Sequence, residues 1–429
     1  MKTKKKIYFL ICYCMLPLFY FFSVFFALII RYKKKTLNIR LVWGDAPIIN
    51  NVYWSRAMKK SGYASETYTD SYCSTINKRE DYDKILQEHF WNIPLQIKYY
   101  LGFFESLFKY DIFFISFSGY FLGKTPYWWL EHHLLDLSRK KVVVLPFGLD
   151  SYVYQRVRST SLTHGLMMSI PNPARQQQNI GKKVDYWCAK ADCVIPGVMN
   201  PDGFGRWDVL MPSSLHIDLD HWQQSLRCNT SDGHSQVVRI VHFPNHRGFK
   251  GTEFIISAIN QLKEEGLLVE LTLLEGKQNI EVRHTLQYEA DILVEQIIAT
   301  GHGLNGLEGM ASGLPTISNL EDDDYILPIR RWSYFNECPI VSASPETLVD
   351  VLRKLVTRPE LRKQLGQAGR EYVEKYHGLD SAQYLFREVI EYIYGRRESL
   401  INLYHPILGE YPKRKPTVKH PLVNNKIVT

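Results

Sequence analysis

Residues 290–315 have the sequence ADILVEQIIATGHGLNGLEGMASGLP, and this stretch decides the fold of the chain. Its apolar start predicts a buried strand at 291–294, and the glycines that follow predict a tight turn. A short helix is expected over 304–312, and then a strand at 315–318. This order of strand, turn and helix places free backbone N–H groups at the start of the helix, where they can bind a diphosphate.

Four residues of this stretch are candidate ligands of a nucleotide. Gly303 lets the backbone approach a phosphate closely, and the amides of Leu304 and Asn305 would face that phosphate from the helix N-terminus. Glu308 lies one turn further on, where its carboxylate can accept hydrogen bonds from the vicinal hydroxyls of a ribose. The alternative for Glu308 is an ordinary surface glutamate.

A second candidate site is the segment RGFKG, from Arg247 to Gly251, which follows a predicted strand at 237–243. Open α/β sheets bind ligands at the carboxyl ends of their strands. Arg247 can donate hydrogen bonds to two phosphate oxygens at once, and Lys250 supplies a compact positive charge. We expect both to act on one anion, the alternative being a solvated pair of surface cations.

Two series of alternating strands and helices predict two domains. The first covers 37–222 and the second 237–395, with a polar linker at 223–236 and a basic tail at 396–429. Such alternation is typical of doubly wound α/β domains with parallel, buried strands. The tail is broken by prolines, and we expect it to be loose, either solvated or lying on anionic lipid.

The N-terminus has the features of a membrane anchor. Residues 7–30 carry no charge, which is long enough to span a hydrocarbon core of about 30 Å. Residues 1–40 contain nine Lys and Arg and no acid, and the rest of the chain has a net charge of −1. The basic excess therefore favours a membrane and argues against nucleic acid as a partner. We expect a retained single-pass anchor over 1–36, the alternative being a buried core helix.

The second half resembles the donor domain of a GT-B glycosyltransferase of the large retaining family 4, also called group 1. The resemblance rests on EGMASGLP at 308–315, on RGFKG at 247–251, which is similar to the family's diphosphate clamp, and on 358–373, which is similar to its C-terminal helical signature. It implies two Rossmann-like domains facing across a cleft, a UDP- or GDP-sugar as donor, retention of configuration, and neither a metal nor another cofactor. The first half is similar in architecture only.

One position departs from the family pattern. The first acidic residue of the family motif, which helps to hold the hydroxyls of the transferred sugar, would fall at Thr300. Glu295, at the end of the preceding strand, is the candidate substitute. In the first domain, Asp150 follows a predicted strand and is a candidate catalytic residue. Gly44 and Asp45, in the turn after the first strand, are candidate acceptor-binding residues.

These patterns predict a membrane-anchored glycosyltransferase that moves a sugar from a nucleotide sugar to a glycan or lipid-linked acceptor, in envelope polysaccharide or glycolipid biosynthesis. Arg247 and Lys250 would neutralise the leaving diphosphate in catalysis. Because the family's donors are made in the cytoplasm, the domains are expected to face it, as in a bacterial inner membrane. Seven cysteines without a C-x-x-C pair favour a reducing compartment.

Two other functions remain open. One is a catalytically degenerate GT-B subunit that acts as a membrane scaffold in glycan assembly, which Thr300 favours. The other is a nucleotide-sugar epimerase with the same two-domain shape.

Overall fold

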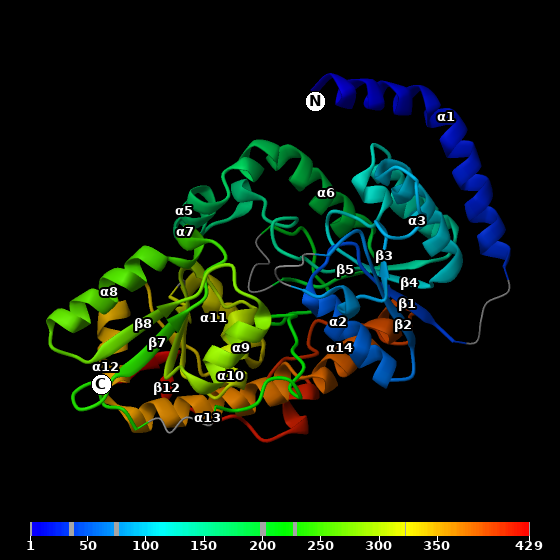
Figure 1. Cartoon of the computed structure of the whole chain (residues 1–429). Coiled ribbons are helices and arrows are strands. Elements are labelled where there is room, and N and C mark those ends of the chain that lie inside the picture. Colours follow the sequence, from blue (N-terminus) through cyan, green and yellow to red (C-terminus); the bar gives the residue numbers. More distant parts are fainter. Residues whose placement is uncertain are drawn as a thin grey trace.

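The structure is a computed structural model that describes residues 2–33, 38–72, 77–197, 203–225, 230–321 and 323–428. Residues 34–36 of the predicted anchor and 226–229 of the predicted linker lie outside these ranges. The described part consists of two α/β domains, each built on a parallel sheet, with a long N-terminal helix beside the first (Figure 1).

The first domain contains a six-stranded sheet with the order β3-β2-β1-β4-β5-β6. Its strands are β1 (Arg40–Trp43), β2 (Ala64–Thr69), β3 (Lys84–Ile85), β4 (Ile112–Ile115), β5 (Lys141–Val144) and β6 (Cys193–Val194). Its helices are α2 (Ile49–Lys60), α3 (Leu95–Lys109), α4 (Glu131–Leu137), α5 (Thr160–Ser169) and α6 (Gln177–Lys190). All residues of β4 are apolar and buried, as expected for a central parallel strand covered on both faces.

The second domain contains a five-stranded sheet with the order β11-β10-β9-β7-β8. Its strands are β7 (Val238–His242), β8 (Val269–Leu273), β9 (Ile292–Thr300), β10 (Thr316–Asn319) and β11 (Val341–Ser342). Its helices are α7 (Arg247–Lys250), α8 (Thr252–Glu264), α9 (Asn279–Tyr288), α10 (Leu304–Ala311), α11 (Asp323–Trp332), α12 (Leu348–Thr357) and α13 (Pro359–Tyr376). The strand predicted at 291–294 is longer than expected, because β9 continues to Thr300 with an irregular register against β10.

Each sheet has a point at which the strand order reverses. In the first sheet β1 lies between β2 and β4, and in the second β7 lies between β8 and β9. The loops that follow two such neighbouring strands run in opposite directions, which opens a crevice at the carboxyl edge of the sheet. The loops after β7 and β9 carry the predicted nucleotide ligands, so the topology brings these two sequence segments together.

Helix α14 (Leu379–Ile393) joins the two domains. It falls within the range 237–395 predicted for the second domain, but its apolar face packs on the first. The ring of Phe386 lies 4.7 Å from that of Trp43, 5.4 Å from Phe114 and 5.7 Å from Trp54, all measured between centroids. Its aromatic contacts therefore tie α14 to the core beside β1 and β4.

The expectation of a loose C-terminal tail is wrong. Tyr411 is buried, and its hydroxyl donates to the backbone oxygen of Lys375 at 2.6 Å. Further on, β12 (Leu422–Val423) and β13 (Lys426–Ile427) form an antiparallel hairpin. Asn425 in its turn donates to the backbone oxygens of Cys338 and Ile340. Because tyrosine, leucine and asparagine anchor it at intervals, the tail is part of the second domain despite its basic residues.

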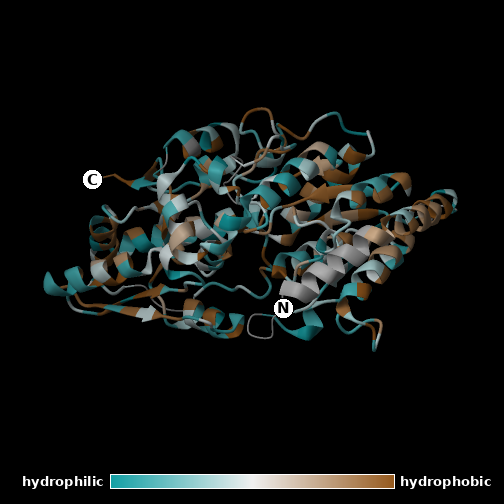
Figure 2. Cartoon of the chain, turned by 90° about the horizontal axis from the view of Figure 1, so that it is seen from above, coloured by the Kyte–Doolittle hydropathy of each residue, from teal (hydrophilic) through white to brown (hydrophobic). Residues whose placement is uncertain are grey.

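Helix α1 (Lys2–Tyr32) runs beside the first domain and contains Pro17 (Figure 1). Hydrophobic residues predominate along its Cys14–Tyr32 part, as they do in the strands inside the domains (Figure 2). This part has a mean hydropathy of 2.0 and is a candidate membrane span by length and composition.

Candidate functional site

The candidate site lies at the reversal point of the second sheet, between the carboxyl ends of β7 and β9. After β7 the chain forms the single turn α7, which ends at Gly251 with a φ of 77°. A side chain at that glycine would meet Ile297 at 2.5 Å. After β9 the chain turns through Gly301, with a φ of 100°, into α10. The sequence thus needs glycine where α7 and β9 come close together.

Lys250 and Glu295 form a buried ion pair at the centre of this site. The Lys250 ammonium contacts a Glu295 carboxylate oxygen and also donates to the side-chain oxygen of Gln296 at 2.9 Å. Lys250 is 7% exposed and Glu295 2%. In this structure the positive charge predicted for a diphosphate is therefore neutralised by the carboxylate predicted to hold a sugar.

Glu295 collects two further hydrogen bonds. The backbone N–H of Gly303 donates to one carboxylate oxygen at 3.2 Å, and the hydroxyl of Ser318 donates to the other at 3.2 Å. The side chain of Asn305 donates to the backbone oxygen of Phe243 at 3.0 Å, which ties the start of α10 to the loop after β7. Leu304, the first residue of α10, is half-buried. A ligand anion at this helix N-terminus would take the place now held by the Glu295 carboxylate.

Arg247 does not join this cluster of charges. Its guanidinium is exposed and pairs with Glu253 at 2.6 Å and with Glu275 at 3.0 Å. These two carboxylates raise its pKa. Arg247 and Lys250 were predicted to converge on one anion, but in this structure each has its own carboxylate partners.

Glu308 is buried on α10 and has no cation beside it among the partners that the structure gives it. The side chain of Asn279 donates to one of its oxygens at 3.2 Å. Burial raises the pKa of Glu308 to about 8; the hydrogen bond from Asn279 works against this rise and the charge of Glu295 adds to it. The alternative of an ordinary surface glutamate is wrong, since Glu308 is only 2% exposed.

Glu308 also faces the first domain. Burial raises the pKa of Tyr53, on α2, and the charge of Glu308 is the next largest cause. Tyr53 is therefore close enough to interact electrostatically with Glu308. The two domains meet beside α10, as a ligand bridging them would require.

Thr300 occupies the position at which the family pattern has an acid. It is the last residue of β9 and pairs in register with Asn319 of β10. The only carboxylate on the strand is that of Glu295, which lies among buried polar groups. That Glu295 takes the place of the missing acid stays a prediction.

The predicted acceptor residues of the first domain lie at its own reversal point. A side chain at Gly44 would meet the backbone oxygen of Tyr68 at 2.1 Å, so β1 and β2 approach too closely for any other residue. Asp45 is fully buried, accepts from the hydroxyl of Ser116 at 3.2 Å, and pairs with Lys124 at 2.7 Å. Burial opposes the charge of Lys124, but the carboxylates of Asp45 and Asp70 outweigh it and raise the Lys124 pKa.

Asp150 is half-buried and bonds to two loops. Its oxygens accept from the backbone N–H groups of Phe117, after β4, and Phe147, after β5, both at 3.0 Å. Burial raises its pKa to about 6, although these two hydrogen bonds work in the opposite direction. The observed contacts fix the loops at the crevice of the first domain. Direct action of Asp150 on a substrate remains a prediction.

Several residues near the sites were not predicted from the sequence. Lys124 is one, although a basic residue in a glycine-containing loop after an apolar strand is a usable signal. Ser318 and His302 are others. His302 is buried in the turn after β9, burial lowers its pKa, and its Nε2 atom has no hydrogen-bond partner among the described residues. A single histidine between glycines gives no indication of burial, so only the fold reveals it.

Helix α5 of the first domain packs against α7 of the second. The backbone N–H of Phe249 donates to the hydroxyl of Ser169 at 2.7 Å. A side chain at Gly165 would meet Ile298 at 2.9 Å. The turn that carries Arg247 and Lys250 is therefore held between its own sheet and a helix of the other domain.

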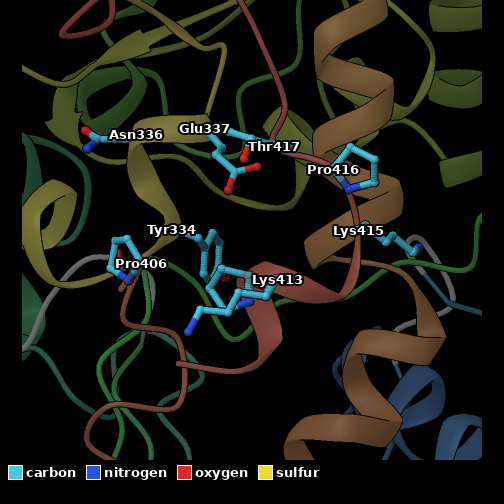
Figure 3. A pocket seen from close by; sticks show the side chains of 10 residues that line it. Tyr334, Asn336, Glu337, Pro406, Lys413, Lys415, Pro416 and Thr417 are labelled. Atoms are coloured by element: carbon cyan, nitrogen blue, oxygen red, sulfur yellow. The ribbon is translucent and has the colours of Figure 1, made fainter. Parts of the chain in front are cut away.

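A separate pocket of about 470 Å³ lies where the C-terminal tail meets the short helix at Tyr334–Glu337 (Figure 3). Lys413, Lys415 and Pro416 line it from the tail side. The carboxylate of Glu337 is already held there by Lys375 and the hydroxyl of Tyr376. Because none of the predicted site residues lines this pocket, it is distinct from the candidate site. Within the part of the chain that the structure describes, no three His, Cys, Asp or Glu side chains are arranged to hold a metal ion.

Sucrose-phosphate synthase from Thermosynechococcus elongatus has a similar structure, with a TM-score of 0.53 and 12% sequence identity over 84% of this chain and 100% of that one. The chain has the GT-B fold. At such low identity the likeness shows the fold alone.

Two weaker likenesses have TM-scores below 0.5. A glycosyltransferase from Rickettsia africae ESF-5 gives a TM-score of 0.47 and 11% identity, covering 84% of this chain and 100% of that one. A putative UDP-N-acetylglucosamine 2-epimerase from Listeria monocytogenes gives 0.46 and 10%, covering 86% and 100%. They do not distinguish transfer from epimerisation. No family model matches the sequence, and neither does any curated protein.

Proposed function

We propose that the chain is a retaining glycosyltransferase of the family 4 type. It takes a sugar from a UDP- or GDP-linked donor and passes it to a glycan or lipid-linked acceptor in envelope polysaccharide or glycolipid biosynthesis. One observation carries the proposal: Lys250, Glu295 and Gly303 are in contact at the reversal point of the second sheet, beside the N-terminus of α10, and the charge of Glu295 acts on the buried Glu308 of that helix. Crevices of this kind bind nucleotides in open α/β sheets.

Each residue then has a role that its surroundings support. Lys250 leaves Glu295 for the diphosphate and stabilises the charge that develops on the leaving group. Glu295, once released, accepts hydrogen bonds from hydroxyls of the transferred sugar. Glu308 holds the ribose, and Arg247 reaches the outer phosphate after exchanging its partners Glu253 and Glu275. The crevice around Gly44 and Asp45 takes the acceptor.

The membrane is part of the proposal. Helix α1 keeps the enzyme at the surface where a lipid-linked acceptor is found, which raises its local concentration. The sequence predicts a single-pass arrangement with both domains in the cytoplasm, as in a bacterial inner membrane, but the contacts of α1 with the first domain favour a helix that stays on one side of the membrane.

A panel of UDP- and GDP-sugars, tested for binding by calorimetry and for transfer or hydrolysis, examines the proposal. We expect one donor to bind and to turn over, and both to be lost in Lys250→Ala and Glu308→Ala. Lys263→Ala is the matched control, because Lys263 is an exposed lysine of the same domain and should change nothing. Transfer that survives Lys250→Ala and Glu308→Ala would refute the site.

The second candidate function, a degenerate subunit acting as a scaffold, is favoured by a specific observation. Both cations of the predicted clamp are already paired with carboxylates, and Thr300 replaces the family's acid. In that case a nucleotide sugar binds without turnover. Conversion of the free donor sugar to its epimer, followed in the same assays, would instead identify an epimerase.

A further inference from the structure

From Leu16 onward, α1 has two distinct faces. One face is directed at the first domain and includes the buried residues Ser23, Ala27 and Ile30. The opposite face is exposed and apolar, and it includes Leu18, Phe21, Phe25, Leu28, Ile29 and Tyr32; Phe22, 57% exposed, lies at the boundary between the two faces. Residues three, four and seven apart share one side of a helix, so the exposed set forms one continuous stripe.

The inner face of α1 is fixed to the domain by aromatic contacts. Phe104 of α3 lies 5.7 Å from Phe22 and 5.2 Å from Phe26 between ring centroids. Phe19 stacks on Tyr127 at 4.3 Å. Helix α1 is therefore docked along the first domain rather than attached to it as a free stalk.

Helix α3 continues the exposed stripe. Its residues Ile97 and Phe108 are 50% and 48% exposed, whereas Leu101 and Phe104 on the same side of the helix are half-buried, Phe104 against α1. Phe108 lines a shallow apolar groove together with the exposed residues at the C-terminal end of α1. The ammonium of Lys33 lies 3.3 Å from the centre of the Phe108 ring and marks the polar edge of this surface.

A docked α1 is incompatible with a complete crossing of the bilayer. The helix that would accompany it into the hydrocarbon, α3, carries Glu105 paired with Lys84 at 2.7 Å and Lys109 paired with Glu66 at 2.5 Å. Such charges are costly in the membrane core. Residues 2–15 of α1, which precede the docked stretch, span about 21 Å at 1.5 Å per residue. That is shorter than the hydrocarbon thickness of about 30 Å.

We propose that α1 and α3 together form one lipid-facing surface, which lies in the plane of an anionic leaflet and leaves both ends of α1 on the same side of the membrane. Charge complementarity indicates that anionic lipid is what covers this surface. Residues 1–40 contain nine basic and no acidic residues, whereas the rest of the chain carries a net charge of −1. An apolar helical face with basic flanks is the form that binds membrane interfaces. The proposal does not depend on the proposed catalytic function.

Topology provides the first test. The full chain is produced with one protease-cleavable tag at each terminus, and sealed membrane vesicles of one orientation are treated with protease from outside. We expect both tags to be removed in one vesicle orientation and both to be protected in the other. Removal of the C-terminal tag with protection of the N-terminal one would mean that α1 crosses the bilayer, which overturns the proposal.

Photocrosslinking provides the second test. Benzoylphenylalanine is placed at position 108 in the full chain bound to vesicles of anionic phospholipid, and at position 254 in a control. Phe254 lies on α8 of the second domain and is also 48% exposed. We expect lipid adducts at position 108 and none at 254. Adducts to a second copy of the chain, or no lipid adduct, at position 108 would refute a lipid surface that includes α3.

Vesicle partitioning gives the size of the effect. Phe108→Glu should weaken binding to anionic vesicles about tenfold, the loss expected when one half-exposed aromatic no longer enters the interface. Ile97→Glu should act in the same direction. Phe254→Glu and Ile280→Glu are the matched controls, since Ile280 on α9 is 53% exposed, and they should leave binding unchanged. Equal effects of the α3 variants and the controls would contradict the proposal.

Discussion

Replacement of Glu295 by glutamine tests the central feature of the candidate site. Glu295 and Lys250 are buried and in contact, so removal of the carboxylate leaves the ammonium without a counter-charge. Breaking a buried pair by removing one partner costs about 3–5 kcal/mol, because the remaining charge stays in a place of low polarity. Gln296 offers only a neutral oxygen to Lys250 and cannot replace the charge.

Thermal unfolding of the full chain in detergent measures this cost. At about 3 °C per kcal/mol for a domain of this size, Glu295→Gln should lower the Tm by roughly 10 °C. Lys250→Met should have a similar effect. The double variant should lose much less than the sum, because no unpaired charge remains. Glu281→Gln is the control: it breaks the exposed pair with Lys277 and should change stability by less than about 1 kcal/mol.

The affinity for UDP provides a second test of the Lys250–Glu295 ion pair. If Lys250 exchanges Glu295 for phosphate oxygens, then Glu295→Gln removes the competitor and should tighten binding of UDP measured by calorimetry. A Tm equal to that of the unaltered chain, together with additive effects in the double variant, would refute the ion pair. Unchanged affinity for UDP in a destabilised Glu295→Gln protein would refute only the exchange.

Three further predictions follow from single contacts. The pKa of Glu308 is about 8 in the folded protein, against 4.5 for an ordinary glutamate. Between these pH values the folded state retains a proton that the unfolded state has released, so the free energy of unfolding falls by roughly 4 kcal/mol as pH rises. Glu308→Gln should abolish this fall, and its Tm should no longer decrease for this reason between about pH 5 and 9. Gly44→Ala should prevent accumulation of folded protein, since its side chain would lie 2.1 Å from a backbone oxygen of β2; normal yield and Tm would contradict this. Asn425→Ala should cost about 2–3 kcal/mol in denaturant unfolding, because the backbone oxygen of Cys338 and the buried guanidinium of Arg330 lose a partner, whereas Asn424→Ala, which keeps the backbone oxygen that Arg330 uses, should cost less.

The architecture could be predicted from the sequence because its signals are local. Apolar runs such as 112–115 and 141–144 indicate buried parallel strands, and the glycines before α10 indicate a tight turn. These signals do not depend on distant parts of the chain. The tail after Pro406 shows the opposite case. Its prolines and lysines are typical of a loose segment, but Tyr411 and Asn425 find buried partners in the second domain.

The partners of charged residues could not be predicted in the same way. Arg247 and Lys250 are three residues apart, and the turn of α7 sends their side chains to different carboxylates. Arg247 meets the nearby Glu253 and also Glu275, 28 residues away in the loop after β8, whereas Lys250 meets Glu295, 45 residues away on β9. Sequence spacing identifies cationic side chains that can bind an anion, whereas the fold determines which carboxylates neutralise those side chains.

The contacts of Glu295 link two predicted steps: binding of the diphosphate by Lys250 and binding of the sugar by Glu295. In the structure, this carboxylate accepts from Lys250, from the Gly303 amide and from Ser318, which are groups suited to an anion. It therefore occupies the position expected for a phosphate oxygen. A diphosphate that binds there must displace Glu295, and a displaced carboxylate needs new donors, which the hydroxyls of the attached sugar supply. A nucleotide diphosphate alone leaves Glu295 without such donors, so a donor with its sugar should bind more tightly than the same nucleotide without it. Equal affinities for the two would mean that Glu295 is a structural counter-ion and takes no part in sugar recognition.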